Sequence, residues 1–408
     1  MHSINQSRSD YLERFVGTVV RGLRAPIIKE GDDLVNIVVD TLINAAEVEG
    51  YEIHDRDIIA LTESIVARPQ GNYASIDDIA KDIENKFEQE TVGVLFPILS
   101  RNRFMNLLKG FARGAQEIVI QLSYPADEVG NHLISVDQID EANVNPWSDT
   151  LTEEEFAQHF GKTSHPFTGV DYIELYRDVV ESEGKKCTIL FSNDPQAILE
   201  HTDSVLVSEV HNRARTLNIL KEAGAKRVYD LGDILAAPTS ENGGYNEEFG
   251  LLGANNATDE SVKLFPSHSQ EIVEAIQAKV KERTGKTIEA MVYGDGAFKD
   301  PVGQIWELAD PVVSPGFTSG LIGTPNEVKL KYLADNQYSD LKGDELADAI
   351  RESIDQKDNQ AKDAKASLGT TPRQLTDLIG SLADLTSGSG DKGTPFVYIQ
   401  GYFDDFTN

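Results

Sequence analysis

The stretch Gly253-Ala-Asn-Asn-Ala-Thr-Asp259-Glu-Ser261 is followed by a helical pattern and then by Val292-Tyr-Gly-Asp295-Gly-Ala-Phe-Lys299-Asp-Pro301. Between the two turns, residues 269–283 repeat apolar side chains at helical spacing, and residues 288–292 predict a short buried strand. A helix followed by a strand returns the chain, so we expect the two turns to lie close together. Carboxylates on such turns suit a hard divalent cation that also holds phosphate oxygens. By spacing alone, two solvated turns are the more common explanation, because Asp and Gly often mark turns.

Composition limits the classes of function. The chain has 408 residues, of which 40% are hydrophobic, and this is enough for two or more domains. Lys and Arg number 37 against 68 Asp and Glu, for a net charge of −31. Such a surface repels nucleic acid phosphates, and no basic stripe offsets it, so we expect no nucleic acid partner.

The single cysteine, Cys187, excludes an intramolecular disulfide and a cysteine-based zinc site. It lies in the strand-like run 186–191, which predicts a buried structural thiol. The sequence has no signal-peptide pattern and no run of about 18 apolar residues, so we expect a soluble cytoplasmic protein without a membrane partner.

Patterns at the N-terminal end predict alternating strands and helices. We expect two short strands in residues 15–28, a helix over 34–46, a strand over 57–62, a polar loop over 63–71 and a helix over 75–87.

Residues 91–245 alternate between strand and helix patterns, which predicts an α/β module with partly parallel strands. Strands are expected at 95–99, 117–122, 186–191, 204–207 and 227–231, and helices at 103–112, 172–181 and 212–223. No Gly-x-Gly-x-x-Gly or P-loop pattern occurs there, so no nucleotide site is assigned. His159, His165 and His211 lack ligand spacing and are interpreted as surface or core histidines.

The C-terminal part contains strand-like patches around Ile305 and Val312, and helical patterns over 344–365 and 371–385. The segment Ser387-Gly-Ser-Gly-Asp-Lys-Gly-Thr-Pro395 then leads into a strand over 396–400. A Gly-rich loop between a helix and a strand brings backbone N–H groups to phosphate, and it serves equally as a flexible connector.

Five segments, in this order, resemble the coenzyme F420-0:γ-glutamyl ligase family. They are Ala25-Pro-Ile-Ile28-Lys-Glu-Gly-Asp-Asp-Leu, Ile58 to Gly71, Asn256-Ala-Thr-Asp259-Glu-Ser261-Val262, Gly285 to Asp295, and Leu375 to Gly401. The resemblance implies a mixed α/β (α+β) fold, in which residues 1–90 and 245–408 form the ligase-like core. Residues 91–244 are an enlarged α/β module of unassigned role. The family also implies a homodimer.

The implied reaction attaches L-glutamate to a carboxylate acceptor similar to F420-0, with GTP (or ATP) as co-substrate and Mg²⁺ or Mn²⁺ as cofactor. A phosphoryl group passes to the acceptor carboxylate, and the glutamate amine then displaces phosphate from the acyl phosphate. By resemblance, the catalytic residues are Asp259, Asp295 and Lys299, and the metal site is formed by Asp259, Asp295 and Gly296. The implied nucleotide-binding residues are Ala25, Pro26, Ile27, Ile28, Glu63, Ser64, Arg68, Val262, Gly388, Ser389, Gly390, Gly393 and Thr394.

The sequence also departs from the family pattern. Gly296 replaces a threonine and removes a hydroxyl ligand, Val262 replaces an asparagine, and Ser389 replaces an acidic loop residue. Lys299 replaces an arginine, which keeps the charge but loses the bidentate fork. These changes motivate an alternative hypothesis, a catalytically silent member that binds a ligand or a partner through the middle module.

Overall fold

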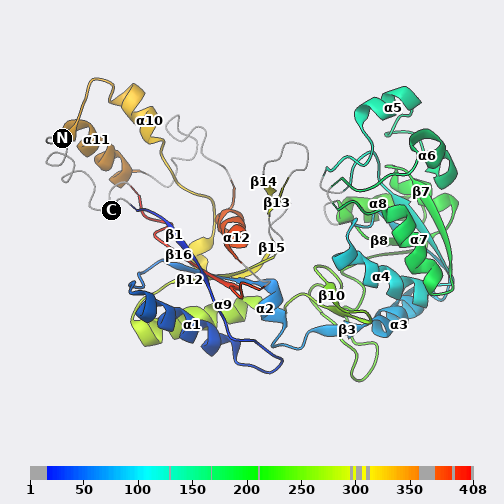
Figure 1. Ribbon diagram of the computed structural model, residues 1–408, viewed down its shortest axis with the longest axis horizontal. Coiled ribbons are helices and arrows are strands. Elements are labelled where there is room, and N and C mark those ends of the chain that lie inside the picture. Colours follow the sequence, from blue (N-terminus) through cyan, green and yellow to red (C-terminus); the bar gives the residue numbers. More distant parts are fainter. Residues whose placement is uncertain are drawn as a thin grey trace. The chain divides into compact units, whose positions relative to one another are not determined.

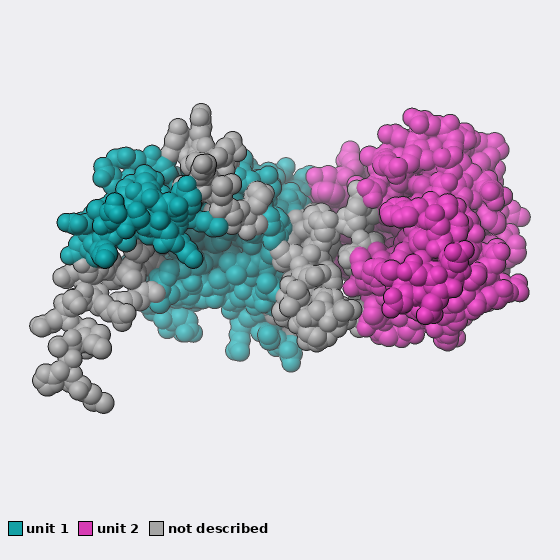
Figure 2. Space-filling model, turned by 90° about the horizontal axis from the view of Figure 1, so that it is seen from above, with its two compact units in different colours: residues 1–66, 268–298, 308–408 teal, residues 67–267, 299–307 magenta. Residues whose placement is uncertain are grey.

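The computed structural model describes residues 16–127, 130–166, 168–209, 212–294, 297–299, 306–308, 313–357, 373–387 and 391–405. The chain divides into two compact units, drawn in teal and magenta in Figure 2. The first unit comprises residues 1–66, 268–298 and 308–408, and the second comprises residues 67–267 and 299–307. The second unit therefore includes residues 67–90 and 245–267 as well as the predicted middle module. Among the described helices, none has the length and apolar character needed to cross a membrane.

The first unit is built on a five-stranded sheet with the order β1-β16-β2-β12-β15. Its strands are β1 (Val19–Leu23), β16 (Phe396–Gln400), β2 (Ile58–Thr62), β12 (Glu289–Gly294) and β15 (Val313–Phe317). The β2 and β12 strands are parallel, and the other neighbours are antiparallel. The three central strands are buried along nearly their whole length, which explains their continuous apolar sequences.

Helices cover both faces of this sheet (Figure 1). On one face, α1 (Leu34–Glu49) and α9 (Ser269–Thr284) contribute buried residues such as Val38 and Ile276 to one core. On the other face, α12 (Leu375–Thr386) packs Ile379 and Ala383 against the strands. A smaller cluster joins the π-helical turn η3 (Leu333–Gln337), which follows α10 (Leu330–Tyr332), to α11 (Asp344–Asp355).

The second unit contains a six-stranded sheet with the order β6-β7-β5-β4-β8-β9. The strands are β6 (Leu151–Thr152), β7 (Lys186–Phe191), β5 (Glu117–Leu122), β4 (Thr91–Leu95), β8 (Ser204–Val207) and β9 (Arg227–Asp230). All neighbours are parallel except β6 and β7, which confirms the predicted partly parallel module. In chain order the parallel strands run 3-2-1-4-5, the doubly wound order in which the strand sequence reverses between β4 and β8.

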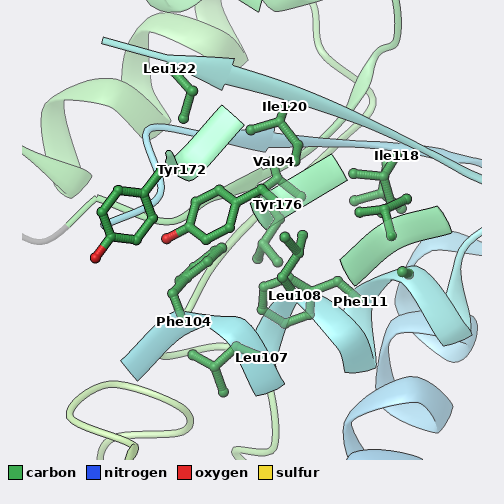
Figure 3. Close-up of a cluster of buried hydrophobic side chains, with 14 of the residues drawn as sticks. Val94, Phe104, Leu107, Leu108, Phe111, Ile118, Ile120, Leu122, Tyr172 and Tyr176 are labelled. Carbon is green, nitrogen blue, oxygen red and sulfur yellow. The ribbon is translucent and has the colours of Figure 1, made fainter. Parts of the chain in front are cut away.

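Helices α4 (Arg101–Gly114) and α7 (Tyr172–Ser182) cover one face of this sheet, and α8 (Arg213–Glu222) with the 3-10 turn η1 (Pro195–Glu200) covers the other. Figure 3 shows the first of these cores, where Phe104 and Phe111 of α4 meet Tyr176 of α7 beneath the strands. The α4 helix also packs closely on α3 (Ile76–Phe87), because Gly110 and Gly114 carry no side chain at the contact.

Short elements complete the second unit. A three-stranded sheet has the order β10-β11-β3, formed by β10 (Asn255–Thr258), β11 (Ser261–Lys263) and β3 (Tyr73–Ser75). Helices α5 (Val136–Ala142) and α6 (Glu153–Phe160) follow β5. A further two-stranded sheet, of β13 (Ala297–Lys299) and β14 (Trp306–Leu308), belongs wholly to neither unit, because residues 297, 298 and 308 are assigned to the first unit and residues 299, 306 and 307 to the second.

Most predicted elements are confirmed, and three are wrong. Residues 63–71 are not all loop, because α2 (Glu63–Ala67) begins where β2 ends and the Thr62 hydroxyl accepts a bond from the Ile65 amide. Residues 16–28 contain one strand, β1, rather than two, since Gly22 stays paired with β16. The strand predicted at 95–99 is instead β4, which ends at Leu95. Gly93 weakens the strand pattern in the sequence, but the absence of a side chain there leaves room for the Ile198 side chain.

The lone thiol and two of the three histidines singled out above lie in the described parts of the chain. Cys187 is buried, as predicted. His165 is a core residue whose Nε2 lies 2.9 Å from the Asp127 carboxylate, while His159 is exposed. His211 lies outside the described residues, as do Ile305, Val312 and the second half of the helix predicted over 344–365.

Candidate functional site

The site in the first unit lies along the ends of the strands of the five-stranded sheet, and this row of strand ends is called the sheet edge below. Strand register aligns Leu23, Phe396, Leu61 and Val292 in a single row across β1, β16, β2 and β12. The row lies where β1, β2 and β12 end and where β16 begins. Four segments that are distant in the sequence therefore leave the sheet at this edge.

Glu63 and Gly294 are neighbours at this edge because β2 and β12 run parallel and end together. A Cβ atom built on Gly294 would lie 3.1 Å from Cγ of Glu63, so the absent side chain provides the space that Glu63 occupies. The Ser64 amide donates to the Glu63 carboxylate at 2.7 Å. Asp295 follows Gly294 directly in the chain. Glu63 thus lies beside the segment that leads to the second predicted metal ligand.

The segment after β1 meets the segment before β16 at the same edge. The Ala25 amide donates to the Gly393 carbonyl at 3.0 Å, and a Cβ atom on Gly22 would lie 3.1 Å from Cβ of Thr394. Of the two predicted isoleucines, Ile28 is buried, whereas Ile27 is 82% exposed. Pro26 is exposed beside it. The structure therefore gathers Ala25, Glu63, Gly393 and Thr394 from three separate sequence segments.

Tyr293 adds a residue that the sequence did not indicate. Its side chain is 1% exposed, and among the described residues its hydroxyl has no hydrogen-bond partner of acceptable geometry. Burial raises the pKa of this hydroxyl well above its usual range, and the nearby Ser387 hydroxyl opposes part of that shift. Ser387 is the first residue of the Gly-rich segment that the sequence suggests for phosphate. A buried hydroxyl without a partner is uncommon and marks a position where a ligand group or water is needed.

Asp259 lies in the second unit, at the tip of the hairpin between β10 and β11. Thr258 pairs with Ser261, which leaves Asp259 and Glu260 as the two turn residues. Asp259 is exposed, and its carboxylate makes no hydrogen bond or ion pair with the part of the chain that the structure describes. Glu260 is instead engaged by Lys109 and Arg113. Asp259 is therefore the carboxylate of this turn that is available to a cation.

The remaining predicted residues are placed as follows. Arg68 is exposed and Val262 is buried in the core, both in the second unit, so Val262 offers no side chain to a ligand. Lys299 ends β13, and its side chain is not described. Asp295, Gly296, Gly388, Ser389 and Gly390 lie outside the described residues. Within the described residues, no three acidic, histidine or cysteine side chains are grouped so as to hold a metal ion.

These features define a mixed α/β protein of two units, in which one sheet edge of the first unit collects glycines, a carboxylate and hydroxyls. Such an edge suits recognition of a phosphate-bearing small molecule. The model of the F420-0:gamma-glutamyl ligase family matches residues 22–401. The chain therefore belongs to this ligase family, and the match also runs through the middle module. A search of curated protein sequences finds no relative that matches the chain.

Proposed function

We propose that this ligase uses a nucleoside triphosphate, GTP or ATP, to join L-glutamate to a carboxylate acceptor similar to F420-0. The proposal rests on one observation, the gathering of Ala25, Glu63, Gly393 and Thr394 at one sheet edge next to Gly294. The glycine backbone and the hydroxyl gathered at this edge are groups that suit phosphate, and Tyr293 supplies a buried hydroxyl on the neighbouring strand.

In the proposed reaction, an acceptor carboxylate oxygen attacks the γ-phosphorus and the nucleoside diphosphate leaves. The glutamate nitrogen then attacks the acyl carbon of the acyl phosphate, phosphate leaves and the nitrogen loses a proton. Asp259 and Asp295 would hold Mg²⁺ or Mn²⁺, which neutralises phosphate charge when it is bound. The Asp259 carboxylate is exposed and has no ion-pair partner among the described residues, and it fits a hard cation because such ions take oxygen ligands.

In this scheme the residues of the chain mainly position the reactants. The Glu63 carboxylate is fixed by the Ser64 amide and by the space at Gly294, so it presents a defined acceptor at the sheet edge. Lys299 would add positive charge toward the transferred phosphoryl group. We also propose, following the family resemblance, that the protein acts as a homodimer, which light scattering would test.

The experiment is a glutamate-dependent turnover assay. Purified protein is incubated with GTP or ATP, Mn²⁺, L-glutamate and a deazaflavin acceptor, and mass spectrometry follows the acceptor. We expect the mass of one glutamyl residue to be added with stoichiometric release of phosphate. Asp259→Asn should abolish the addition, whereas Asp140→Asn, a change of an exposed aspartate in the same unit, should not. Phosphate release that is independent of glutamate would contradict the proposal.

A second candidate is a ligand-binding role for the second unit without catalysis. The observation that favours it is the reversal of strand order between β4 and β8, because doubly wound sheets bind ligands outside the carboxyl ends of the strands at such a point. Arg101 and Arg213 begin the two helices that follow these strands. Metal-independent nucleotide binding that Arg213→Ala weakens and Glu63→Gln leaves unchanged would favour this candidate.

A further inference from the structure

One face of helix α4 holds the Asp259 turn. Asn106, Lys109 and Arg113 are spaced by three and four residues and so lie on one side of the helix. Their neighbours Phe104, Leu108 and Phe111 point into the core beneath the sheet (Figure 3). The two faces of α4 thus have different partners, the sheet on one side and the turn on the other.

Asn106 binds the residues on both sides of the turn. Its side chain is 2% exposed, and its Nδ2 donates to the Thr258 carbonyl at 2.8 Å and to the Ser261 carbonyl at 3.3 Å. These carbonyls belong to the residues on either side of the Asp259–Glu260 tip. A buried amide that binds both ends of a two-residue turn fixes the position and direction of that turn.

Two basic side chains form ion pairs with Glu260, the other residue at the tip of the turn. Lys109 forms an ion pair with Glu260 and donates to the Asp259 carbonyl at 3.4 Å. Arg113 reaches Glu260 at 3.2 Å and is itself held by Glu183 at 2.9 Å and by Asp77. Glu260 is therefore paired with two basic side chains, whereas no residue that the structure describes pairs with the Asp259 carboxylate.

The opposite side of the turn is fixed by the small sheet. The Ile76 amide donates to the Glu260 carbonyl at 3.0 Å, and the Thr258 and Ser261 hydroxyls bond to each other at 2.7 Å. Because the Ile76 amide begins α3 and α3 packs on α4, the turn is held by two helices that are fixed against each other.

We propose that α4 positions Asp259 for catalysis: Asn106 sets the turn, and Lys109 and Arg113 occupy Glu260 so that only Asp259 receives the divalent cation. This inference rests on the proposed function, in which Asp259 is a metal ligand. It assigns a role to the middle module, since α4 lies wholly within residues 91–244. Asn106, Lys109 and Arg113 act through Asp259 and are positioning residues rather than catalytic ones.

The test compares Asn106→Ala and Asn106→Asp with Leu108→Val. The first two remove the amide donor, whereas the third is a mild core change on the opposite face of the same helix. We expect the Mn²⁺ concentration for half-maximal turnover to rise about 10-fold or more in both Asn106 variants, as for other groups that orient metal ligands. Saturating Mn²⁺ should restore kcat, and the KM for nucleotide should stay constant. Leu108→Val should lower the thermal midpoint without changing the Mn²⁺ dependence.

Hydrogen exchange at residues 255–262 provides a readout that is independent of activity. Faster exchange in Asn106→Ala, but not in Leu108→Val, is expected whether or not the protein is a ligase. If wild-type protein shows no metal-dependent turnover, the proposed function fails while the exchange result still reports on the turn. Unchanged exchange in Asn106→Ala would overturn the inference, and so would faster exchange with an unchanged Mn²⁺ dependence, because α4 would then hold the turn for stability alone.

Discussion

Replacing Gly294 by alanine tests the arrangement of the sheet edge. The new Cβ atom would lie 3.1 Å from Cγ of Glu63 and 3.4 Å from its Cβ and Cδ. Contacts this short require Glu63 to move by a few tenths of an ångström. The backbone of Gly294 has no left-handed conformation, so alanine itself is tolerated there. The substitution therefore displaces one predicted ligand-binding carboxylate with little damage to the strand.

The expected magnitudes separate binding from stability. Overpacking costs about 1–3 kcal/mol, and the smaller conformational freedom of alanine in the unfolded chain returns about 0.4–1 kcal/mol. We expect a net loss of about 0–2.6 kcal/mol in the free energy of unfolding. A charged hydrogen bond lost by Glu63 is worth about 1.5–3 kcal/mol, which corresponds to about a 10- to 150-fold weaker nucleotide affinity.

Isothermal titration with GTP and Mn²⁺ measures the affinity, and urea denaturation measures the stability. Gly17→Ala is the matched control, because a Cβ atom at Gly17 would meet no atom within 4 Å. A folded Gly294→Ala protein with wild-type nucleotide affinity would refute the reasoning, since Glu63 would then have no role at this edge.

Three further predictions concern the second unit. Hydrogen bonds from Lys109 and then Arg113 lower the pKa of the Glu260 carboxyl, whose unfolded value is about 4.5, so its stabilising effect is complete above that value and declines as the pH falls toward the folded pKa. Glu260→Gln should therefore lower the thermal midpoint more at pH 7 than at pH 3. Equal midpoint changes at both values would contradict this. Burial raises the pKa of Cys187 to about 11, so a thiol reagent at pH 8 should label native protein about two orders of magnitude more slowly than urea-unfolded protein, and similar rates would show an accessible thiol. Gly114→Ala should destabilise by about 1–3 kcal/mol in denaturant titrations, although alanine normally favours helices, because its Cβ atom would lie 2.2 Å from the Ala80 carbonyl oxygen; a gain in stability would show that α3 and α4 separate readily.

Much of the fold follows from local patterns in the sequence. The strands at 117–122, 204–207 and 396–400 match β5, β8 and β16 residue for residue, because each is mostly apolar and buried. The errors arise where tertiary contacts override composition. Gly93 weakens the strand pattern of β4, yet the Ile198 side chain fills the space above it.

The site was predictable from the sequence only in part. Family motifs indicated Glu63, Gly393 and Thr394, and the strand register brings these residues to one edge. Local sequence gave no sign of Asn106 as a partner of the Asp259 turn, because 152 positions separate it from Thr258. Tyr293 was overlooked for a similar reason, since an aromatic residue that ends a buried strand normally belongs to the core.

The most direct test of the central claim is calorimetric titration of GTP and ATP, with and without Mn²⁺, on the wild type and on Asp259→Asn, Asp295→Asn and Asp140→Asn. The account predicts nucleotide binding that depends on the metal, is lost in the first two variants and is retained in the third. Absence of nucleotide binding by the wild type under every condition would contradict the proposed ligase site.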